Sequence, residues 1–182
     1  MMMLSKTEVR LSGTGGQGII LSGILLAEAA VLDGKKVVQT QSYGPEARGG
    51  ASKAEVIISD SPILYPKVIT PKFLLIMSQE AARLYASNVS KGGLIVVDST
   101  VVESIPESPA RVIAIPITQL AGEQIGSPLT ANILAIGAIA SAAGLVTYEA
   151  MIEALRLRLP RVFNINSRAL KLGWEEGQKG VC

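Results

Sequence analysis

Two glycine-containing segments near the N-terminus hold the residues best suited to chemistry. In the first, residues 13–18, the glycines Gly13, Gly15 and Gly18 fit the pattern G-x-G-x-x-G between an expected strand and an expected helix. Glycines permit a tight turn and let a ligand approach the backbone, and the helix that follows offers free N–H groups to an anion. The segment predicts either a phosphate-bearing ligand or a turn needed only for packing or partner contact. Its candidate residues are Gly13, Thr14, Gly15, Gly16, Gln17 and Gly18.

The dinucleotide-binding form of this pattern is incomplete. It requires an Asp or Glu near the end of the second strand to bind the ribose hydroxyls. Here the strand expected at residues 36–40 ends in Gln39 and Thr40, and Gln41 follows. We therefore favour another phosphate-bearing group, or a packing role, over NAD or FAD.

The second segment, residues 41–50, contains an aromatic hydroxyl, a guanidinium and a carboxylate together with three glycines. The planar fork of Arg48 suits a phosphate or carboxylate, although a surface pair with Glu46 is the simpler alternative. A right-handed strand–helix–strand crossover would make the first two strands parallel, so both segments would leave the same edge of the sheet, where α/β proteins place ligands. The segment therefore predicts a shared ligand site or a subunit interface. Its candidate residues are Ser42, Tyr43, Gly44, Arg48, Gly49 and Gly50.

A third candidate, Asn132, stands near the start of a long apolar helix. A buried amide is expected to have a hydrogen-bond partner. Asn132 is predicted to hold a neighbouring loop, to touch a ligand or to serve a purely structural contact.

The composition excludes several kinds of chemistry. The chain has no histidine and one cysteine, Cys182, so it cannot by itself build an iron–sulfur cluster, a Cys/His zinc site or a Ser-His-Asp triad. We predict no metal site and no cofactor held by this chain alone. A net charge of +2 without a Lys/Arg run argues against nucleic acid. The sequence shows no signal peptide and no stretch able to span a bilayer, so we expect a cytoplasmic protein that does not bind membranes.

Strand and helix patterns alternate along the chain, which predicts one α/β domain over residues 1–182. We expect three layers, α/β/α, with a Rossmann-like sheet that is mostly parallel or mixed. Strands are predicted at residues 9–12, 36–40, 51–59, 73–77, 94–97 and 111–115. Helices are predicted at residues 19–32, 79–86, 129–143 and 147–159, with a last one from about residue 166.

Two of these helices carry information about packing. The helix at residues 129–143 has Ala131, Ala135, Ala138 and Ala142 on one stripe, which predicts close packing within the chain. The helix at residues 19–32 has one charge, Glu28, so we expect it to be covered twice, by its own sheet and by another subunit. The chain is accordingly expected to associate with partners, or with itself when isolated.

Together the two loops and Asn132 make the sequence similar to the gamma subunit, or gamma domain, of 2-oxoacid:ferredoxin oxidoreductases. The motifs are residues 13–18 before the first helix, residues 42–50 before the third strand and residues 132–137 on the late helix. Their order and spacing agree over nearly the whole chain. The form of residues 42–50 resembles the 2-oxoglutarate branch most, with pyruvate, branched-chain 2-oxoacid and indolepyruvate enzymes as close relatives.

The resemblance implies a division of labour between subunits. Enzymes of this family convert a 2-oxoacid, coenzyme A and oxidised ferredoxin into an acyl-CoA, carbon dioxide and reduced ferredoxin. Thiamine diphosphate and Mg²⁺ lie between the alpha and beta subunits, and iron–sulfur clusters lie on beta and, where present, on a ferredoxin-like delta subunit. The gamma unit packs on alpha and helps form the coenzyme A side of the site, with no redox centre of its own.

Three rival interpretations remain open from the residues themselves. The chain could be a stand-alone nucleotide- or coenzyme A-binding module, which would bind its ligand alone as a monomer. It could be a purely structural subunit that uses both loops as interface. An independent nicotinamide-dependent dehydrogenase is disfavoured by the missing ribose acid and the absence of histidine.

Overall fold

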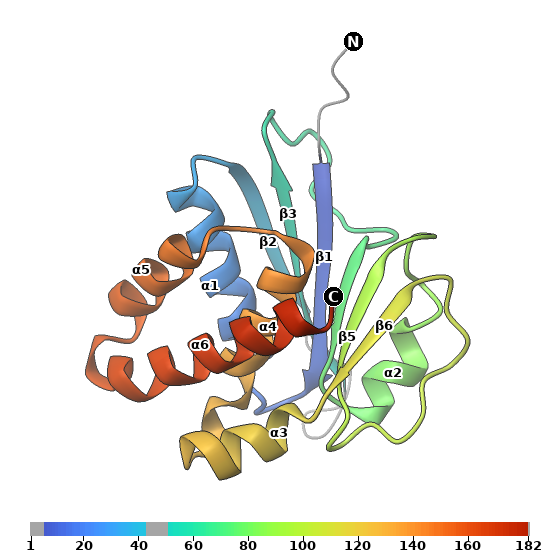
Figure 1. Cartoon of the computed structure of the whole chain (residues 1–182). Coiled ribbons are helices and arrows are strands. Elements are labelled where there is room, and N and C mark those ends of the chain that lie inside the picture. Colours follow the sequence, from blue (N-terminus) through green and yellow to red (C-terminus); the bar gives the residue numbers. More distant parts are fainter. Residues whose placement is uncertain (1–5, 43–50, 182) are drawn as a thin grey trace.

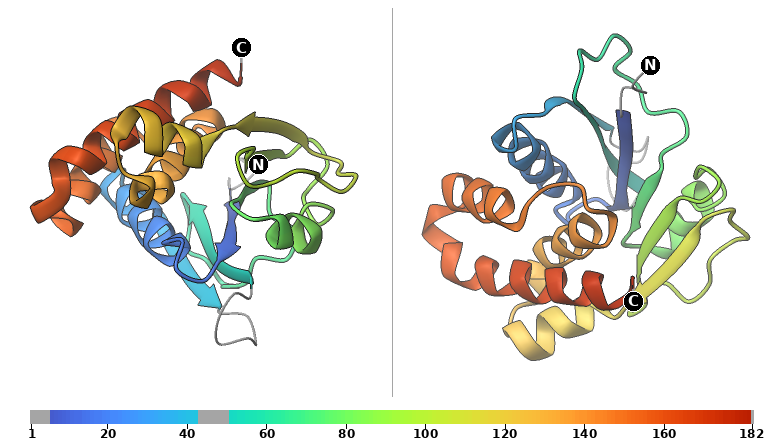
Figure 2. Two further views of the ribbon diagram at one scale, coloured as in Figure 1. Left: turned by 90° about the horizontal axis from the view of Figure 1, so that it is seen from below. Right: turned by 45° about the horizontal axis from the view of Figure 1, so that its top comes forward.

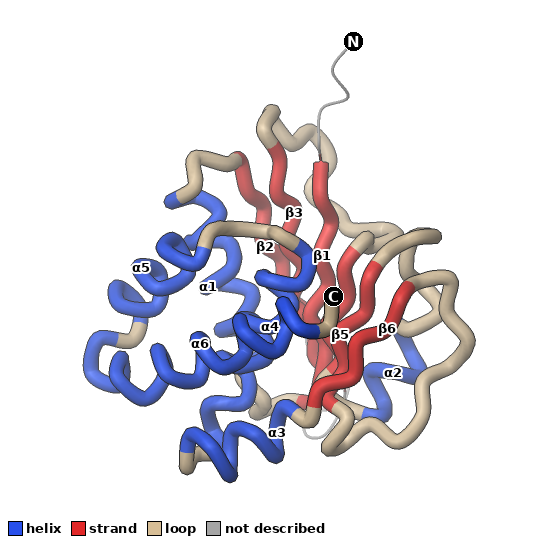
Figure 3. Tube along the Cα trace, viewed as in Figure 1, coloured by secondary structure: helices blue, strands red, loops and turns tan. Residues whose placement is uncertain are grey.

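The computed structural model describes residues 6–42 and 51–181, which form a mixed six-stranded sheet between two unequal helical layers (Figure 1). Helix α2 covers one face, and α1, α4, α5 and α6 cover the other (Figure 3). The strands are β1 (Lys6–Thr14), β2 (Lys36–Ser42), β3 (Ala51–Ser59), β4 (Phe73–Ile76), β5 (Leu94–Asp98) and β6 (Arg111–Ile115). The helices are α1 (Ile19–Leu32), α2 (Gln79–Tyr85), α3 (Ile117–Leu120), α4 (Ala131–Ala143), α5 (Tyr148–Arg158) and α6 (Phe163–Lys179). The predicted three-layer α/β fold is confirmed.

The strand order is β2-β3-β1-β4-β5-β6. Strands β1, β4, β5 and β6 run parallel to one another, whereas β3 is antiparallel to both β1 and β2. Strands β1 and β2 therefore point the same way, as the crossover argument predicts. They are not neighbours, because β3 lies between them.

Several element boundaries differ from the sequence prediction. Strand β1 extends to both sides of the predicted residues 9–12 because all nine of its residues pair with β3. The predicted long helix at 129–143 begins instead with a 3-10 turn, Pro128–Thr130, before α4. Helix α6 starts at Phe163, earlier than predicted. Helix α3 and the π-helical turn after it, Ala121–Ile125, were not predicted.

The sheet separates two hydrophobic cores. Alternate residues of β1 show the division, since Val9 and Leu11 belong to the larger core under α1 and α4. The side chain of Arg10 faces the other layer, where its Nε donates to Glu55 Oε1 at 2.7 Å and its guanidinium lies 5.2 Å from the centre of the Tyr85 ring. The buried charge of Arg10 is therefore paired and stacked, as burial requires.

Helices α4 and α6 approach each other at backbone distance. A Cβ atom added to Gly173 would overlap the carbonyl oxygen of Leu134, and one added to Gly177 would overlap that of Ala138. Ala135 and Ala138, from the predicted stripe, are fully buried. The prediction that this stripe serves close packing within the chain is confirmed.

Candidate functional site

The glycine loop, residues 13–18, connects the end of β1 to the start of α1. Gly16 and Gly18 have φ angles of 90° and 74°, a left-handed region that other residues adopt at a cost. Helix α1 begins without a side-chain cap and without an acidic residue in its first turn. Its first N–H groups therefore lack intrahelical partners and favour an acceptor group.

Gln17 braces this loop from within. Its Oε1 accepts a hydrogen bond from the Thr14 backbone N–H at 2.7 Å, and its Nε2 donates to the Met77 carbonyl oxygen at 2.8 Å. A Cβ atom on Gly13 would overlap Gln17 Oε1. Gln17 thus ties the loop to the end of β4, and Gly13 is needed for internal packing.

Asn132 is brought against the same loop from the far end of the sequence. The side-chain Nδ2 of Asn132 donates to the Gly18 carbonyl oxygen at 3.3 Å, and the backbone carbonyl oxygen of Asn132 accepts from Ser22 Oγ at 3.2 Å. A Cβ atom on Gly18 would overlap Nδ2 of Asn132. The prediction that Asn132 holds a neighbouring loop is confirmed.

The remaining two glycines have a different environment. A Cβ atom added to Gly15 or Gly16 would meet no atom within 4 Å among the described residues. Packing therefore accounts for Gly13 and Gly18, whereas Gly15 and Gly16 leave open space beside the backbone. Open space next to unpaired N–H groups is what a ligand approaching the backbone needs.

The glycine loop also lies at a topological switch point, where the crossovers after two neighbouring strands run on opposite faces of the sheet. After β1 the chain crosses by α1 on one face toward β2, and after the adjacent β4 it crosses by α2 on the other face toward β5. Figure 2, left, shows α1 and α2 on opposite sides of the sheet. Such a switch point opens a crevice at the carboxyl ends of the strands, where α/β proteins bind ligands.

A hollow of about 310 Å³ lies at this point. No charged side chain lines it. Its lining residues are Gly16, Gln17, Gly18, Met77, Thr118, Pro128, Leu129, Ala131 and Asn132.

Thr118 and the acid behind it, Asp98, were missed by the sequence reasoning. Asp98 is fully buried at the end of β5 and accepts the Thr118 hydroxyl at 2.5 Å, the Thr118 N–H at 3.2 Å and the Thr100 N–H at 3.0 Å. The available signal was an acid directly after the apolar strand 94–97. The π-helical turn Ala121–Ile125 follows α3.

The second predicted segment is described only at its start. Ser42 ends β2, is exposed, and pairs with Lys53 of β3, while Gly13 pairs with Ser52. Ser42 therefore lies at the same sheet edge as the glycine loop, separated from it by β3. The other predicted residues lie outside the described residues: Tyr43, Gly44, Arg48, Gly49 and Gly50.

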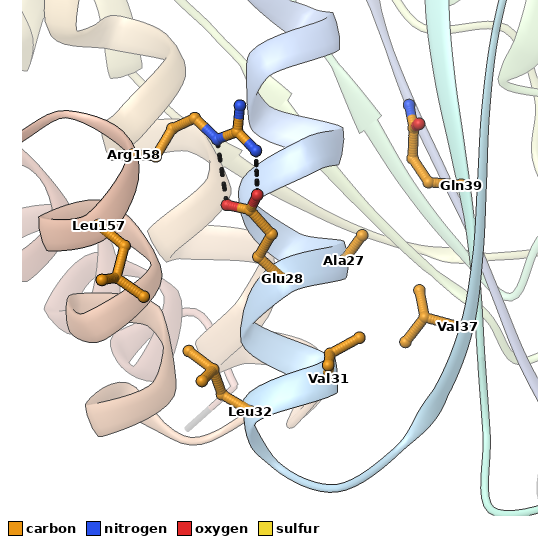
Figure 4. Close-up of a pocket in the computed structure, with 8 residues that line it drawn as sticks. All are labelled: Ala27, Glu28, Val31, Leu32, Val37, Gln39, Leu157 and Arg158. Atoms are coloured by element: carbon orange, nitrogen blue, oxygen red, sulfur yellow. Dashed lines mark hydrogen bonds and ion pairs between the residues drawn. The ribbon is translucent and has the colours of Figure 1, made fainter.

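A larger hollow, of about 550 Å³, lies elsewhere, between α1, α5 and β2 (Figure 4). Its apolar lining includes the exposed Val31, Leu32 and Leu157, and Glu28 accepts from Arg158 Nε at 3.2 Å across it. Helix α5 of the same chain thus supplies part of the second cover that was expected for α1 from another subunit. This groove does not lie at the switch point of the sheet, so size alone does not make it the ligand site.

Within residues 6–42 and 51–181, no three His, Cys, Asp or Glu side chains gather closely enough to hold a metal ion. In the same part of the chain, no helix combines the length and the apolar character needed to cross a membrane.

The sequence matches the protein family described as pyruvate ferredoxin/flavodoxin oxidoreductase over residues 8–176. It is 48% identical to the 2-oxoglutarate synthase subunit KorC of Methanocaldococcus jannaschii over 159 residues, which are 86% of this chain and 85% of the relative. The solved gamma subunit of a keto/oxoacid ferredoxin oxidoreductase from Geobacter sulfurreducens superposes with a TM-score of 0.86 at 42% identity, covering 95% of this chain and 99% of that one.

The same fold forms part of a longer chain. The 2-oxoglutarate:ferredoxin oxidoreductase of Magnetococcus marinus, solved with 2-oxoglutarate, coenzyme A and succinyl-CoA bound, superposes with a TM-score of 0.86. The identity is 22%, and the match covers 96% of this chain and 31% of that one, so this likeness concerns the fold. The family match and the end-to-end agreement with a gamma subunit confirm the resemblance seen in the sequence: the protein belongs to the pyruvate ferredoxin/flavodoxin oxidoreductase family, among its gamma-type subunits.

Proposed function

We propose that this chain is the gamma subunit of a 2-oxoglutarate:ferredoxin oxidoreductase and that its glycine loop forms part of the coenzyme A side of the active site. In the reaction, the 2-oxoacid loses its carboxylate as carbon dioxide, and its acyl carbon forms a thioester with coenzyme A. Two electrons pass to ferredoxin and one proton is released. The 2-oxoglutarate assignment is supported by the 48% identity to the 2-oxoglutarate synthase subunit of Methanocaldococcus jannaschii.

The observation that carries the coenzyme A assignment is the open backbone of Gly15 and Gly16 at the switch point. These glycines are not needed to avoid a collision, because a Cβ atom at either would meet no described atom within 4 Å. They stand beside the uncapped start of α1 and the hollow lined by Asn132. A phosphate or carbonyl oxygen of the ligand could accept hydrogen bonds from these N–H groups.

The redox chemistry is assigned to partner subunits. With one cysteine and no histidine, this chain lacks the ligands of an iron–sulfur cluster. Thiamine diphosphate, Mg²⁺ and the clusters would lie on the alpha, beta and ferredoxin-like delta subunits, with ferredoxin as the electron acceptor of the complex. The gamma chain would contribute binding surface and assembly contacts in the cytoplasm.

The test is Gly15→Ala in the assembled enzyme, with Gly122→Ala as the matched control. Gly15 has an ordinary φ angle and free space, and at Gly122 the nearest atom to an added Cβ is Pro128 Cγ at 3.8 Å. Both variants should therefore fold and assemble. We expect Gly15→Ala to raise the KM for coenzyme A by about tenfold, the effect of losing roughly one hydrogen bond, and Gly122→Ala to leave it unchanged. An unchanged KM in both variants would make the loop an interface or packing element.

Arg48 provides a second arm, since it is proposed to contact the same ligand. Loss of a charge-assisted hydrogen bond costs about 1.5–3 kcal/mol, which is roughly a ten- to hundredfold loss of binding. Arg48→Ala should raise the KM for coenzyme A while iron–sulfur content stays the same. Loss of complex formation would instead assign Arg48 to the subunit interface, and no change in either property would leave it a surface residue.

A further inference from the structure

We infer that the hollow beside the glycine loop holds a neutral hydrogen-bond donor of coenzyme A, and that Thr118 accepts the hydrogen bond. The donor is either an amide N–H of the pantetheine arm or the amino group of the adenine ring. This inference rests on the proposed function, because it assumes that coenzyme A is the ligand of the loop. It assigns a role to Thr118 and Asp98, which the sequence motifs do not include.

The hydrogen-bonding direction of Thr118 is fixed from behind. Its hydroxyl donates its one proton to the buried carboxylate of Asp98 at 2.5 Å. The N–H groups of Thr100 and Thr118 donate to the same carboxyl group, so its oxygens act as acceptors here. Toward the hollow, the Thr118 oxygen therefore offers lone pairs and no proton.

Asn132 presents a second acceptor to the same space. Its Nδ2 is directed to the Gly18 carbonyl oxygen at 3.3 Å, which orients the amide with Oδ1 away from the loop. Among the described residues, none donates a hydrogen bond to Oδ1. No fully buried side-chain oxygen there lacks a partner, so Oδ1 is not fully buried. Asn132 lines the hollow, so Oδ1 is the acceptor that its side chain can offer to a ligand there.

The rest of the lining is uncharged and largely apolar. Met77, Pro128 and Leu129 form this part, and the Leu129 side chain, at 91% exposure, is covered by nothing in the described chain. No lysine or arginine lines the hollow, so it lacks the charge-assisted donors that a buried phosphate requires. A neutral group with N–H donors and an apolar surface matches this lining better than a phosphate does.

Coenzyme A contains both kinds of group. Its phosphates need donors and positive charge, which the hollow lacks on its side chains, while the backbone N–H groups at the start of α1 lie at its margin. The pantetheine arm is slender and carries two amides, and adenine carries one amino group. The two kinds of group would therefore bind at different places. The N–H donor would meet the acceptors inside the hollow, and a phosphate or carbonyl oxygen would meet the backbone N–H groups of the glycine loop.

The test compares Thr118→Val with Thr118→Ser in the assembled enzyme. Valine keeps the shape of threonine and removes the acceptor together with the hydrogen bond to Asp98. Serine keeps both and controls for the loss of the methyl group, and a general disturbance at Asp98 would weaken both inhibitors rather than one. Pantetheine and adenosine 3′,5′-bisphosphate serve as separate inhibitors competing with coenzyme A. We expect Thr118→Val to raise the inhibition constant of one fragment about three- to tenfold, as for one neutral hydrogen bond, and Thr118→Ser to keep it within twofold of the parent.

The fragment that weakens identifies the donor: pantetheine for an amide N–H, adenosine bisphosphate for the adenine amino group. Unchanged inhibition by both fragments in a folded Thr118→Val enzyme would overturn the inference. If Gly15→Ala still raises the KM for coenzyme A in that case, the proposed function stands without it. If Gly15→Ala is also silent, the coenzyme A assignment of the loop fails as well.

Discussion

Gly13 and Gln17 provide a direct test of how the glycine loop is held. Gly13→Ala would place a methyl group on Gln17 Oε1, so the glutamine side chain must leave its position. It would then lose its hydrogen bonds with the Thr14 N–H and the Met77 carbonyl oxygen, at 2.7 and 2.8 Å. At about 1 kcal/mol for each bond, the expected loss in free energy of unfolding is about 2 kcal/mol.

Gln17→Ala removes the same two bonds by another route and should cost a similar amount. Because both variants act through one side chain, their costs should not add. The double variant is expected to lose about 2 kcal/mol rather than about 4 kcal/mol, a coupling of about 2 kcal/mol. Gly13 also lies close to the Ile19 side chain, where an added Cβ atom would stand 3.0 Å from Cδ1, so a small residual cost remains after Gln17 is gone.

The assay is urea denaturation of the parent, both single variants and the double variant. The single tryptophan, Trp174, reports tertiary structure, and circular dichroism of the same samples checks that the two transitions coincide. Gly15→Ala is the control and should leave the midpoint unchanged. Additive losses in the double variant would refute the brace, because they would mean that Gly13 and Gln17 stabilise the loop independently.

Two further outcomes are expected. Gly173→Ala should destabilise the chain by about 1–3 kcal/mol, the usual cost of overpacking, because its methyl group would overlap the Leu134 carbonyl; a gain in thermal stability, as helix propensity alone predicts, would contradict the backbone contact of α4 and α6. Burial raises the pKa of Tyr148, with Glu175 and Glu149 adding to the effect. Stability linked to this hydroxyl is therefore complete below the unfolded pKa near 10 and is lost as pH rises through the folded pKa. Between about pH 9 and 11 the stability of Tyr148→Phe, measured by its urea midpoint, should fall less with rising pH than that of the parent. An equal fall in both proteins would mean that Tyr148 titrates alike in the folded and unfolded states.

Local patterns in the sequence predict several elements to the residue. The bounds of α1, β3 and β6 agree with those expected from the glycine loop, from the imperfect alternation at 51–59 and from the prolines around 111–115. Strand β1 is longer than predicted because its polar start, Lys6–Glu8, belongs to a strand only through pairing with β3. The pattern of residues along one strand does not show which other strand it will pair with.

The candidate site shows the same limit more sharply. The sequence indicates that Asn132 has a partner, but the partner, Gly18, is 114 residues away. The link between Asp98 and Thr118 joins β5 to a short helix that has no clear periodic pattern. These residues meet only because the parallel strands end at one edge, so the fold had to be known before Thr118 could be placed beside the glycine loop.

This chain is proposed to complete a 2-oxoacid:ferredoxin oxidoreductase on the coenzyme A side, with the redox centres on its partner subunits. The most direct measurement is ferredoxin reduction by the co-expressed alpha, beta and delta subunits, with and without this chain, as a function of coenzyme A concentration. We expect the purified chain alone to be colourless and inactive, and its addition to restore 2-oxoglutarate-dependent turnover with a lower KM for coenzyme A. Full turnover with the same KM in its absence, or turnover by the chain alone, would contradict this proposed role of the chain.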